Sequence, residues 1–202
     1  MSLTSKYKII YCDPAWSYND KAIAGKRGSC CKYPVMTVYE ISRLPVERLA
    51  DNDCILFVWC TWPHYFDAQK IIEAWDFDFK TVAFVWIKKN ENGTVFKGLG
   101  HWTRSNSEYC LLATKGKPKR IDASISQIIE SIPREHSKKP DIVRNKILKL
   151  CGDLPRIELF ARTRVHGWDV WGIDEKLQLE PLEAFTQSHT HTLREKMQKT
   201  KD

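Results

Sequence analysis

The sequence predicts an α/β fold in which a mostly parallel sheet is flanked by helices. Short apolar runs rich in β-branched and aromatic residues alternate along the chain with stretches whose apolar residues recur at helical spacing. Several runs are apolar throughout, as strands buried on both faces require. This alternation is typical of parallel sheets whose strands are connected by helices.

Five apolar runs are expected to form strands of this sheet. The first must end at Pro14, because proline has no N–H to donate to a ladder. Asp13 is therefore expected at the carboxyl end of a central strand, where open α/β sheets hold their active sites. The five runs are 9–12, 54–59, 81–87, 108–114 and 156–161.

Three helices are expected between these strands. Thr37 can cap a short helix over 38–44. Pro63 and Pro140 each begin a longer helix, because the backbone angle of proline suits the first helical turn. The last of these helices is expected to end at Gly152.

Length and composition indicate one globular domain. The 202 residues are 43% hydrophobic and 28% charged, as in ordinary globular proteins. No apolar run approaches the roughly 20 residues of a membrane helix, and the first residues lack the apolar stretch of a signal peptide, so a cytoplasmic location is expected. The domain is expected to cover 1–176, and the polar segment 177–202 to form a peripheral helix or tail.

The seven cysteines do not suggest a metal site. Their number is odd, they are scattered, and no C-x-x-C pair occurs among them. Neither a zinc site nor a disulfide framework is therefore expected, and buried free thiols are the better interpretation.

The charge balance favours a polyanionic partner. Lysine and arginine number 32 against 25 acidic residues, which gives a net charge of +7 and a pI near 9.0. Basic residues lie in predicted loops together with aromatic residues, a combination that suits phosphates and stacked bases. The alternative is that they are solvated loop charges. The basic candidates for nucleic-acid contact are Lys26, Arg27, Lys97 and Arg104.

Three constellations could carry chemistry. The first is Asp13-Pro14-Ala15-Trp16, which can hold a flat group bearing an exocyclic amine, although an ordinary turn followed by a core tryptophan is the alternative. The second is Gly100-His101-Trp102, within a loop over 90–107 that is long enough to suggest function. The third is 157–162, where Glu158 near the end of a strand suits ribose hydroxyls, although a lone strand glutamate is more often solvated.

Taken together and in this order, these motifs resemble a known family. The chain is similar over about 7–175 to the N6-adenine methyltransferases related to the catalytic subunit of the eukaryotic mRNA adenosine methyltransferase, in their short bacterial or phage form. The matching segments include Asp13-Pro14-Ala15-Trp16, Tyr33-Pro34-Val35-Met36, Trp86-Ile87-Lys88, Gly100-His101-Trp102, Glu108-Tyr109-Cys110-Leu111-Leu112, His136-Ser137-Lys138-Lys139-Pro140 and Ile157-Glu158-Leu159-Phe160-Ala161-Arg162.

The resemblance implies a class I methyltransferase-like Rossmann fold in permuted motif order, with S-adenosylmethionine as cofactor and no metal. Asp13 and Pro14 would accept hydrogen bonds from the adenine amino group, and Trp16 would pack near the base. These hydrogen bonds would favour a tetrahedral nitrogen aimed at the methyl group, so positioning would supply much of the catalysis. The residues implied to bind the cofactor are Asp13, Lys139, Glu158, Phe160, Arg162 and Asp174. Those implied to bind the substrate, with the basic candidates above, are Trp16, Tyr18, His101 and Trp102, the last two as a gate.

Two positions depart from the family pattern. Ala15 stands where the family usually has a second proline, and Ile173 stands where it has a polar residue.

We expect methyl transfer to adenine in DNA, since no RNA-binding module accompanies the domain. RNA as substrate, and a non-catalytic nucleic-acid-binding subunit, are the alternatives. Members of the family often work as dimers, so a homodimer or heterodimer is open.

Overall fold

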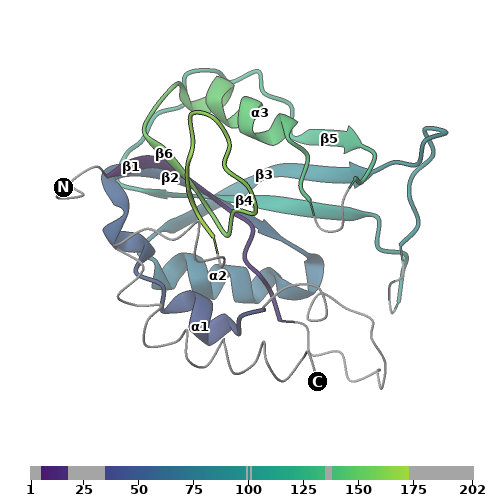
Figure 1. Cartoon of the computed structure of the whole chain (residues 1–202), viewed down its shortest axis with the longest axis horizontal. Coiled ribbons are helices and arrows are strands. Elements are labelled where there is room, and N and C mark those ends of the chain that lie inside the picture. The colour runs from purple at the N-terminus through teal and green to yellow at the C-terminus, as the bar shows by residue number, and fades with distance from the viewer. Residues whose placement is uncertain (1–5, 18–34, 99, 101, 135–137, 173–202) are drawn as a thin grey trace.

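The computed structural model describes residues 6–17, 35–98, 100, 102–134 and 138–172. Its centre is a seven-stranded sheet in the order β5-β3-β4-β2-β1-β6-β7 (Figure 1). The strands are β1 (Tyr7–Cys12), β2 (Ala50–Cys60), β3 (Asp78–Lys88), β4 (Ser107–Lys115), β5 (Ile128–Ser131), β6 (Arg156–Leu159) and β7 (Asp169–Trp171). The helices are α1 (Val38–Ser42), α2 (Tyr65–Ala74) and α3 (Ile142–Cys151), with 3-10 turns η2 (Val46–Arg48) and η3 (Trp62–His64).

The sheet is mostly parallel, as predicted. β1 pairs in parallel with β2 and β6, β6 with β7, and β3 with β5. β4 alone of these strands runs antiparallel to both of its neighbours, β2 and β3. β1, β2, β3 and β6 therefore end, and β4 begins, at one edge of the sheet, which we call the carboxyl edge.

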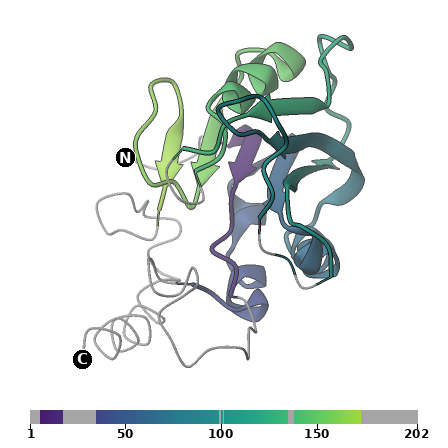
Figure 2. The same ribbon diagram turned by 90° about the vertical axis from the view of Figure 1, so that its right-hand side faces the viewer.

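Helices cover both faces of the sheet. α1 and α2 lie on one face and α3 on the other, as the two perpendicular views show (Figures 1 and 2). Ile10 and Cys12 belong to the core cluster that includes Ile71 of α2, whereas Tyr11 belongs to the cluster that includes Ile147 of α3. Successive side chains of β1 therefore pack alternately into the two cores, and this explains why the run is apolar throughout.

Two of the predicted helix signals are confirmed, and three predicted helix bounds are corrected. Thr37 forms a capping box with Glu40 at the start of α1, and Gly152, with φ of +92°, follows the end of α3. The helix expected to begin at Pro63 instead begins at Tyr65, because Pro63 lies in the 3-10 turn η3. The helix expected to begin at Pro140 begins at Ile142, and the helix expected over 38–44 ends at Ser42.

The strand predicted over 156–161 is shorter than expected. It ends at Leu159, because Phe160 has φ of +61°, which is incompatible with extended backbone. β5 and β7 were not predicted at all. The segment 177–202 lies outside the described residues, and among the described helices none is long and apolar enough to cross a membrane.

Candidate active site

The carboxyl edge brings the first and third predicted constellations together. In the sheet register, Cys12 lies beside Val58 of β2 and beside Leu159 of β6. Asp13 and Phe160, which follow directly, are therefore neighbours across two parallel strands that end at the same level. This is the position at which open α/β sheets bind their ligands.

The turn after β1 is held by backbone hydrogen bonds. The N–H of Trp16 donates to the carbonyl of Pro14 at 2.8 Å, and the N–H of Met36 donates to the carbonyl of Ala15 at 2.9 Å. Ala15 is buried, so its small side chain fits where the family usually has proline. A carbonyl oxygen has two lone pairs, so that of Pro14 can still accept another hydrogen bond.

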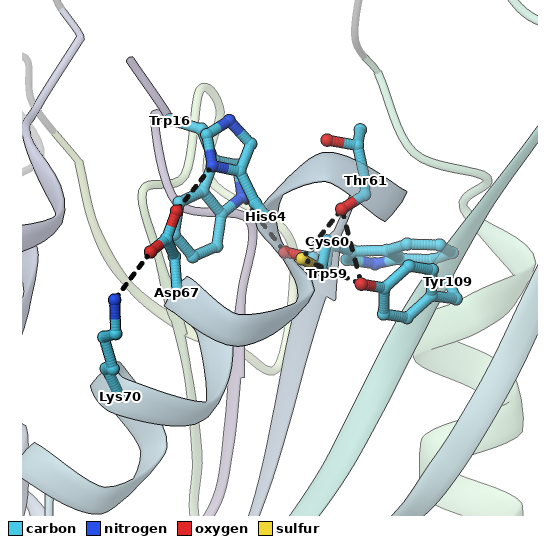
Figure 3. Close-up of polar contacts among 8 residues, drawn as sticks. All are labelled: Trp16, Trp59, Cys60, Thr61, His64, Asp67, Lys70 and Tyr109. Atoms are coloured by element: carbon cyan, nitrogen blue, oxygen red, sulfur yellow. Dashed lines mark hydrogen bonds and ion pairs between the residues drawn. The ribbon is translucent and has the colours of Figure 1, made fainter. Parts of the chain in front are cut away.

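Trp16 is buried at this turn, with 5% of its surface exposed. Its indole N–H donates to the carbonyl of Trp59 at 3.2 Å, and its ring stacks on His64 with 5.1 Å between centroids (Figure 3). His64 Nδ1 lies 3.2 Å from Asp67 Oδ2, and Asp67 also pairs with Lys70. His64 therefore supports the ring of Trp16, and contact of Trp16 with a base stays a prediction.

Asp13 belongs to a buried network of alternating charges. Lys139 Nζ donates to Asp13 Oδ2 at 2.7 Å and lies 3.2 Å from Glu108 Oε2. The other oxygen of Glu108 accepts a hydrogen bond from Lys88 at 2.5 Å. Lys88 ends β3 and Glu108 is near the start of β4, so the antiparallel pairing of these strands delivers both to the carboxyl edge. The network Asp13–Lys139–Glu108–Lys88 joins four segments of the chain.

Aromatic rings line this network. Lys139 Nζ lies 5.7 Å from the ring centroid of Trp59, and Lys88 Nζ lies 4.9 Å from that of Trp86. At such distances a ring face attracts a cation. Both tryptophans belong to the core cluster on the α3 side of the sheet, which places the network on that face.

The network sets the protonation of its members. Burial raises the pKa of Asp13 above its ordinary value, although Lys139 opposes this. Burial also acts to raise the pKa of Glu108, but Lys139 and Lys88 outweigh it, so that pKa is lowered. The pKa of Lys139 is raised, because Asp13 and Glu108 outweigh the effect of its burial. Lys139 is therefore a firmly protonated cation, whereas Asp13 is an unusually basic carboxylate.

Glu158 is already engaged by a side chain that the sequence did not single out. Arg144 of α3 donates from Nε and Nη2 to the two carboxylate oxygens, each at 2.7 Å. The guanidinium also lies 5.8 Å from the ring centroid of Tyr11. Glu158 is 9% exposed, so it is not a solvated edge charge. Its expected contact with a cofactor stays a prediction, and Arg144 fixes the direction of its carboxylate.

Phe160 occupies a strained backbone conformation beside Asp13. A positive φ is rare for a bulky residue, and strain of this kind is concentrated at functional sites. The ring packs edge-on against Trp171, with 5.3 Å between centroids, and the N–H of Ala161 donates to the carbonyl of Trp171. The positive charge of Arg162 acts on Asp13 to lower its pKa, so Arg162 also belongs to the electrostatic surroundings of the acceptor motif.

The remaining predicted residues divide into two groups. Trp102 is 99% exposed, and Lys97 and Arg104 are exposed on the same loop, which is pinned by a hydrogen bond from the N–H of Gly98 to the carbonyl of Ser105. Their contact with nucleic acid stays a prediction. The others, Tyr18, Lys26, Arg27, His101 and Asp174, lie outside the described residues.

Sequence reasoning missed three residues of this site, Glu108, Arg144 and His64, as parts of it, and it placed Lys88 only in a matching segment and among basic residues near the gate. Glu108 was read only as the start of a matching segment, and nothing in the sequence alone showed that its strand is antiparallel. The available signal was that Lys88, Glu108 and Arg144 are charged residues within or beside apolar runs, because buried charges require partners.

Comparison with known proteins gives consistent likenesses. A family model described as MT-A70 matches residues 7–174. The chain is 34% identical over 195 residues to the "Type II methyltransferase M.MunI" of Mycoplasma sp, covering 86% of this chain and 81% of that protein.

Two eukaryotic relatives are much longer than the chain. It is 26% identical over 165 residues to the "N(6)-adenosine-methyltransferase MT-A70-like protein" of Drosophila melanogaster, covering 80% of this chain but 25% of that protein. It is 25% identical over 182 residues to the "N6-methyladenosine RNA methyltransferase MTA1" of Pyricularia oryzae, covering 83% of this chain and 46% of that protein.

Proposed function

Because the chain belongs to the MT-A70 family, we propose that this adenine N6 methyltransferase takes its methyl group from S-adenosylmethionine and acts on DNA. The observation that carries the proposal is the contact between Lys139 and Asp13 at the carboxyl edge, directly before the carbonyl of Pro14. The contact places a cation beside the anion and the second acceptor of the turn after β1.

The acceptor chemistry follows from the free lone pairs of this turn. Lys139 bonds one oxygen of Asp13, and a carboxylate can accept at its other oxygen as well. Asp13 and the carbonyl of Pro14 would each take one N–H of the adenine amino group. Because that nitrogen is conjugated with the ring, two such hydrogen bonds favour the tetrahedral form that can attack a methyl group. The bound geometry would account for much of the rate.

The protonation of Asp13 suits the proton that must leave. Transfer would form a bond from N6 to the methyl carbon as the bond from that carbon to the sulfonium sulfur breaks, and N6 would then release one of its protons. Because burial raises the pKa of Asp13, its carboxylate is a stronger proton acceptor than a solvated aspartate. Lys139 stays charged beside it and limits how far that pKa rises.

The residues present fit the amino-acid end of S-adenosylmethionine, which supplies a methyl group activated on a sulfonium sulfur. That end is a zwitterion, with a carboxylate and an ammonium group. Lys139 offers the cation for the first, and Asp13, 2.7 Å away, the anion for the second. Phe160 and Glu158 lie on the adjoining strand end and would face the nucleoside part.

DNA is preferred because the likeness to the Type II methyltransferase extends over most of both chains. RNA is the second candidate, and the likeness to the fungal RNA methyltransferase favours it. In either polymer an adenine within a duplex would have to leave the stack to reach Asp13.

In the test, the purified protein is incubated with methyl-labelled S-adenosylmethionine and with DNA and RNA oligonucleotides of matched sequence. Each oligonucleotide is used in single-stranded and in double-stranded form. Nucleoside mass spectrometry then reads N6-methylated adenine. The proposal expects label in adenine of DNA at a higher kcat/KM than in RNA. Faster methylation of RNA would transfer the assignment to the second candidate, and label in neither polymer would refute the proposed function.

A further inference from the structure

The aromatic rings at the start of α2 are not explained by the acceptor motif. Trp62 and Phe66 are 57% and 72% exposed, while Tyr109 beneath them is buried. Ring centroids of Trp62 and Tyr109 lie 4.5 Å apart, and those of Tyr65 and Phe66 lie 5.4 Å apart. We call Trp62, Tyr65, Phe66 and Tyr109 the aromatic platform.

Trp62 is exposed but held in one orientation. Its indole N–H donates to Ser107 Oγ at 3.1 Å, and one side of the ring rests on Tyr109. Tyr109 is itself anchored, because its hydroxyl donates to the carbonyl of Thr61 and to the sulfur of Cys60 (Figure 3). A large exposed ring whose rotamer is already fixed loses little entropy when it binds a flat partner.

The platform lies at the carboxyl edge, but on the other face from the charge network. Trp62 comes two residues after the end of β2, as Asp13 comes directly after the end of β1. Tyr109 belongs to the core cluster on the α1 and α2 side, whereas Trp59, over which Lys139 lies, belongs to the cluster on the α3 side. A base on Trp62 would therefore be a neighbour of the base held by Asp13 and not the same base.

Two basic residues are close in sequence to members of the platform or to their partners. Lys70 is 68% exposed and follows Phe66 by four residues, so both lie on one face of α2. Arg104 is exposed three residues before Ser107, the partner of Trp62. Exposed rings combined with nearby basic residues suit a nucleic-acid strand, since bases stack on rings while phosphates attract lysine and arginine.

We propose that Trp62 is a stacking platform for an unpaired base that flanks the target adenine. The inference rests on the proposed function for its substrate class and adds a substrate-positioning contact to it. Stacking is largely independent of base identity, so the platform contributes affinity and positions the strand without reading sequence.

The test combines protein variants with single abasic sites in the best-methylated oligonucleotide. Trp62→Ala should weaken binding, measured by fluorescence anisotropy, by roughly 5- to 150-fold, and Trp62→Phe should retain most of the affinity. Phe79→Ala is the matched control, because Phe79 is an exposed aromatic residue near the start of β3, at the opposite edge. It should bind like wild type.

The position of the abasic site decides the mechanism. At one flanking position the abasic site should lower the binding affinity of wild type as much as Trp62→Ala does. The same abasic site should lower the affinity of Trp62→Ala no further. Additive losses at every position, or Trp62→Ala binding within twofold of wild type, would overturn the proposal. A change in the sedimentation of Trp62→Ala with unchanged oligonucleotide binding would do so too, and would identify a protein interface.

A second measurement uses the wild-type protein and does not depend on the folding of a variant. An oligonucleotide with 5-iodouracil at that flanking position is irradiated, and the linked peptide is sequenced. Linkage at Trp62 supports the platform, and linkage only elsewhere contradicts it. If wild type methylates DNA or RNA and Trp62→Ala binds the oligonucleotide normally, the stacking proposal is refuted and the proposed function is not. If wild type methylates neither polymer, the proposed function is refuted, whatever the result of the binding measurement.

Discussion

Replacing Glu108 with glutamine is expected to destabilise the fold by about 3 kcal/mol near neutral pH. Glu108 is the anion between two lysines, with contacts of 2.5 Å to Lys88 and 3.2 Å to Lys139. Glutamine keeps the shape of the side chain but removes its charge. Lys88 then loses this partner, and Lys139 keeps its contact with Asp13.

The magnitude follows from the burial of these groups. The side chains of Glu108, Lys139 and Lys88 are 12%, 11% and 20% exposed, so solvent screens their interactions little. Hydrogen bonds to charged groups contribute about 1.5 to 3 kcal/mol each, and breaking one partner of a buried pair costs about 3 to 5 kcal/mol. The lower end applies, because Asp13 still neutralises Lys139.

The pH dependence identifies the charge as the cause. The pKa of Glu108 is lowered in the folded chain, since Lys139 and Lys88 outweigh its burial. Its contribution to stability is therefore fully present above the pKa of an unfolded glutamate, about 4.3, and is lost as pH falls through the folded pKa. The difference between wild type and Glu108→Gln should be full near neutral pH and should shrink below roughly pH 4.

Urea denaturation followed by tryptophan fluorescence measures this difference at each pH. Glu130→Gln is the matched control, because Glu130 also pairs with a lysine, Lys89, but is 55% exposed. It should change stability by less than about 1 kcal/mol. Equal stability of wild type and Glu108→Gln near neutral pH, or a difference that persists unchanged in acid, would refute the reasoning about the network.

Three further results are expected. Lys139→Ala should weaken S-adenosylmethionine binding in calorimetry, because the cation for its carboxylate is lost, and an unchanged affinity would remove Lys139 from the cofactor site. Arg144→Leu and Glu158→Leu should each destabilise the fold by about 3 kcal/mol but together by clearly less than the sum, because each single change leaves a buried charge unpaired; additive losses in a double-mutant cycle would contradict the pairing. Lys97→Ala with Arg104→Ala should flatten the salt dependence of oligonucleotide binding by about one unit per lost phosphate contact, and a wild-type slope would show that this loop does not touch the backbone.

The strands of the central sheet could be predicted because burial on both faces demands unbroken apolar runs. β1 and β2 carry such runs, and the structure confirms both. β5 and β7 lack that signal. β5 is a four-residue edge strand that buries Ile129 between exposed neighbours, and β7 has only three residues. Both depend on pairing with a strand distant in sequence, which no local pattern records.

The acceptor motif could be predicted because Pro14 ends a strand immediately after Asp13. The partners of Asp13 could not. Glu108 reaches the carboxyl edge only because β4 runs antiparallel to its neighbours, and strand direction leaves no mark on the apolar run itself. Likewise, Arg144 meets Glu158 only once α3 has packed over β6. The sequence therefore revealed which residues could carry chemistry, while tertiary packing decided which charges neutralise one another.

The most direct test of the account is methyl transfer by Asp13→Ala under single-turnover conditions, with cofactor affinity measured in parallel by calorimetry. Asp78→Ala is the control, since Asp78 is an 81% exposed carboxylate at the start of β3. The account predicts that Asp13→Ala, saturated with cofactor, loses at least about 100-fold in the rate of N6 methylation, because the acceptor for the N6 protons is gone. A near-normal rate would contradict the assignment of Asp13 as the group that holds the adenine amine.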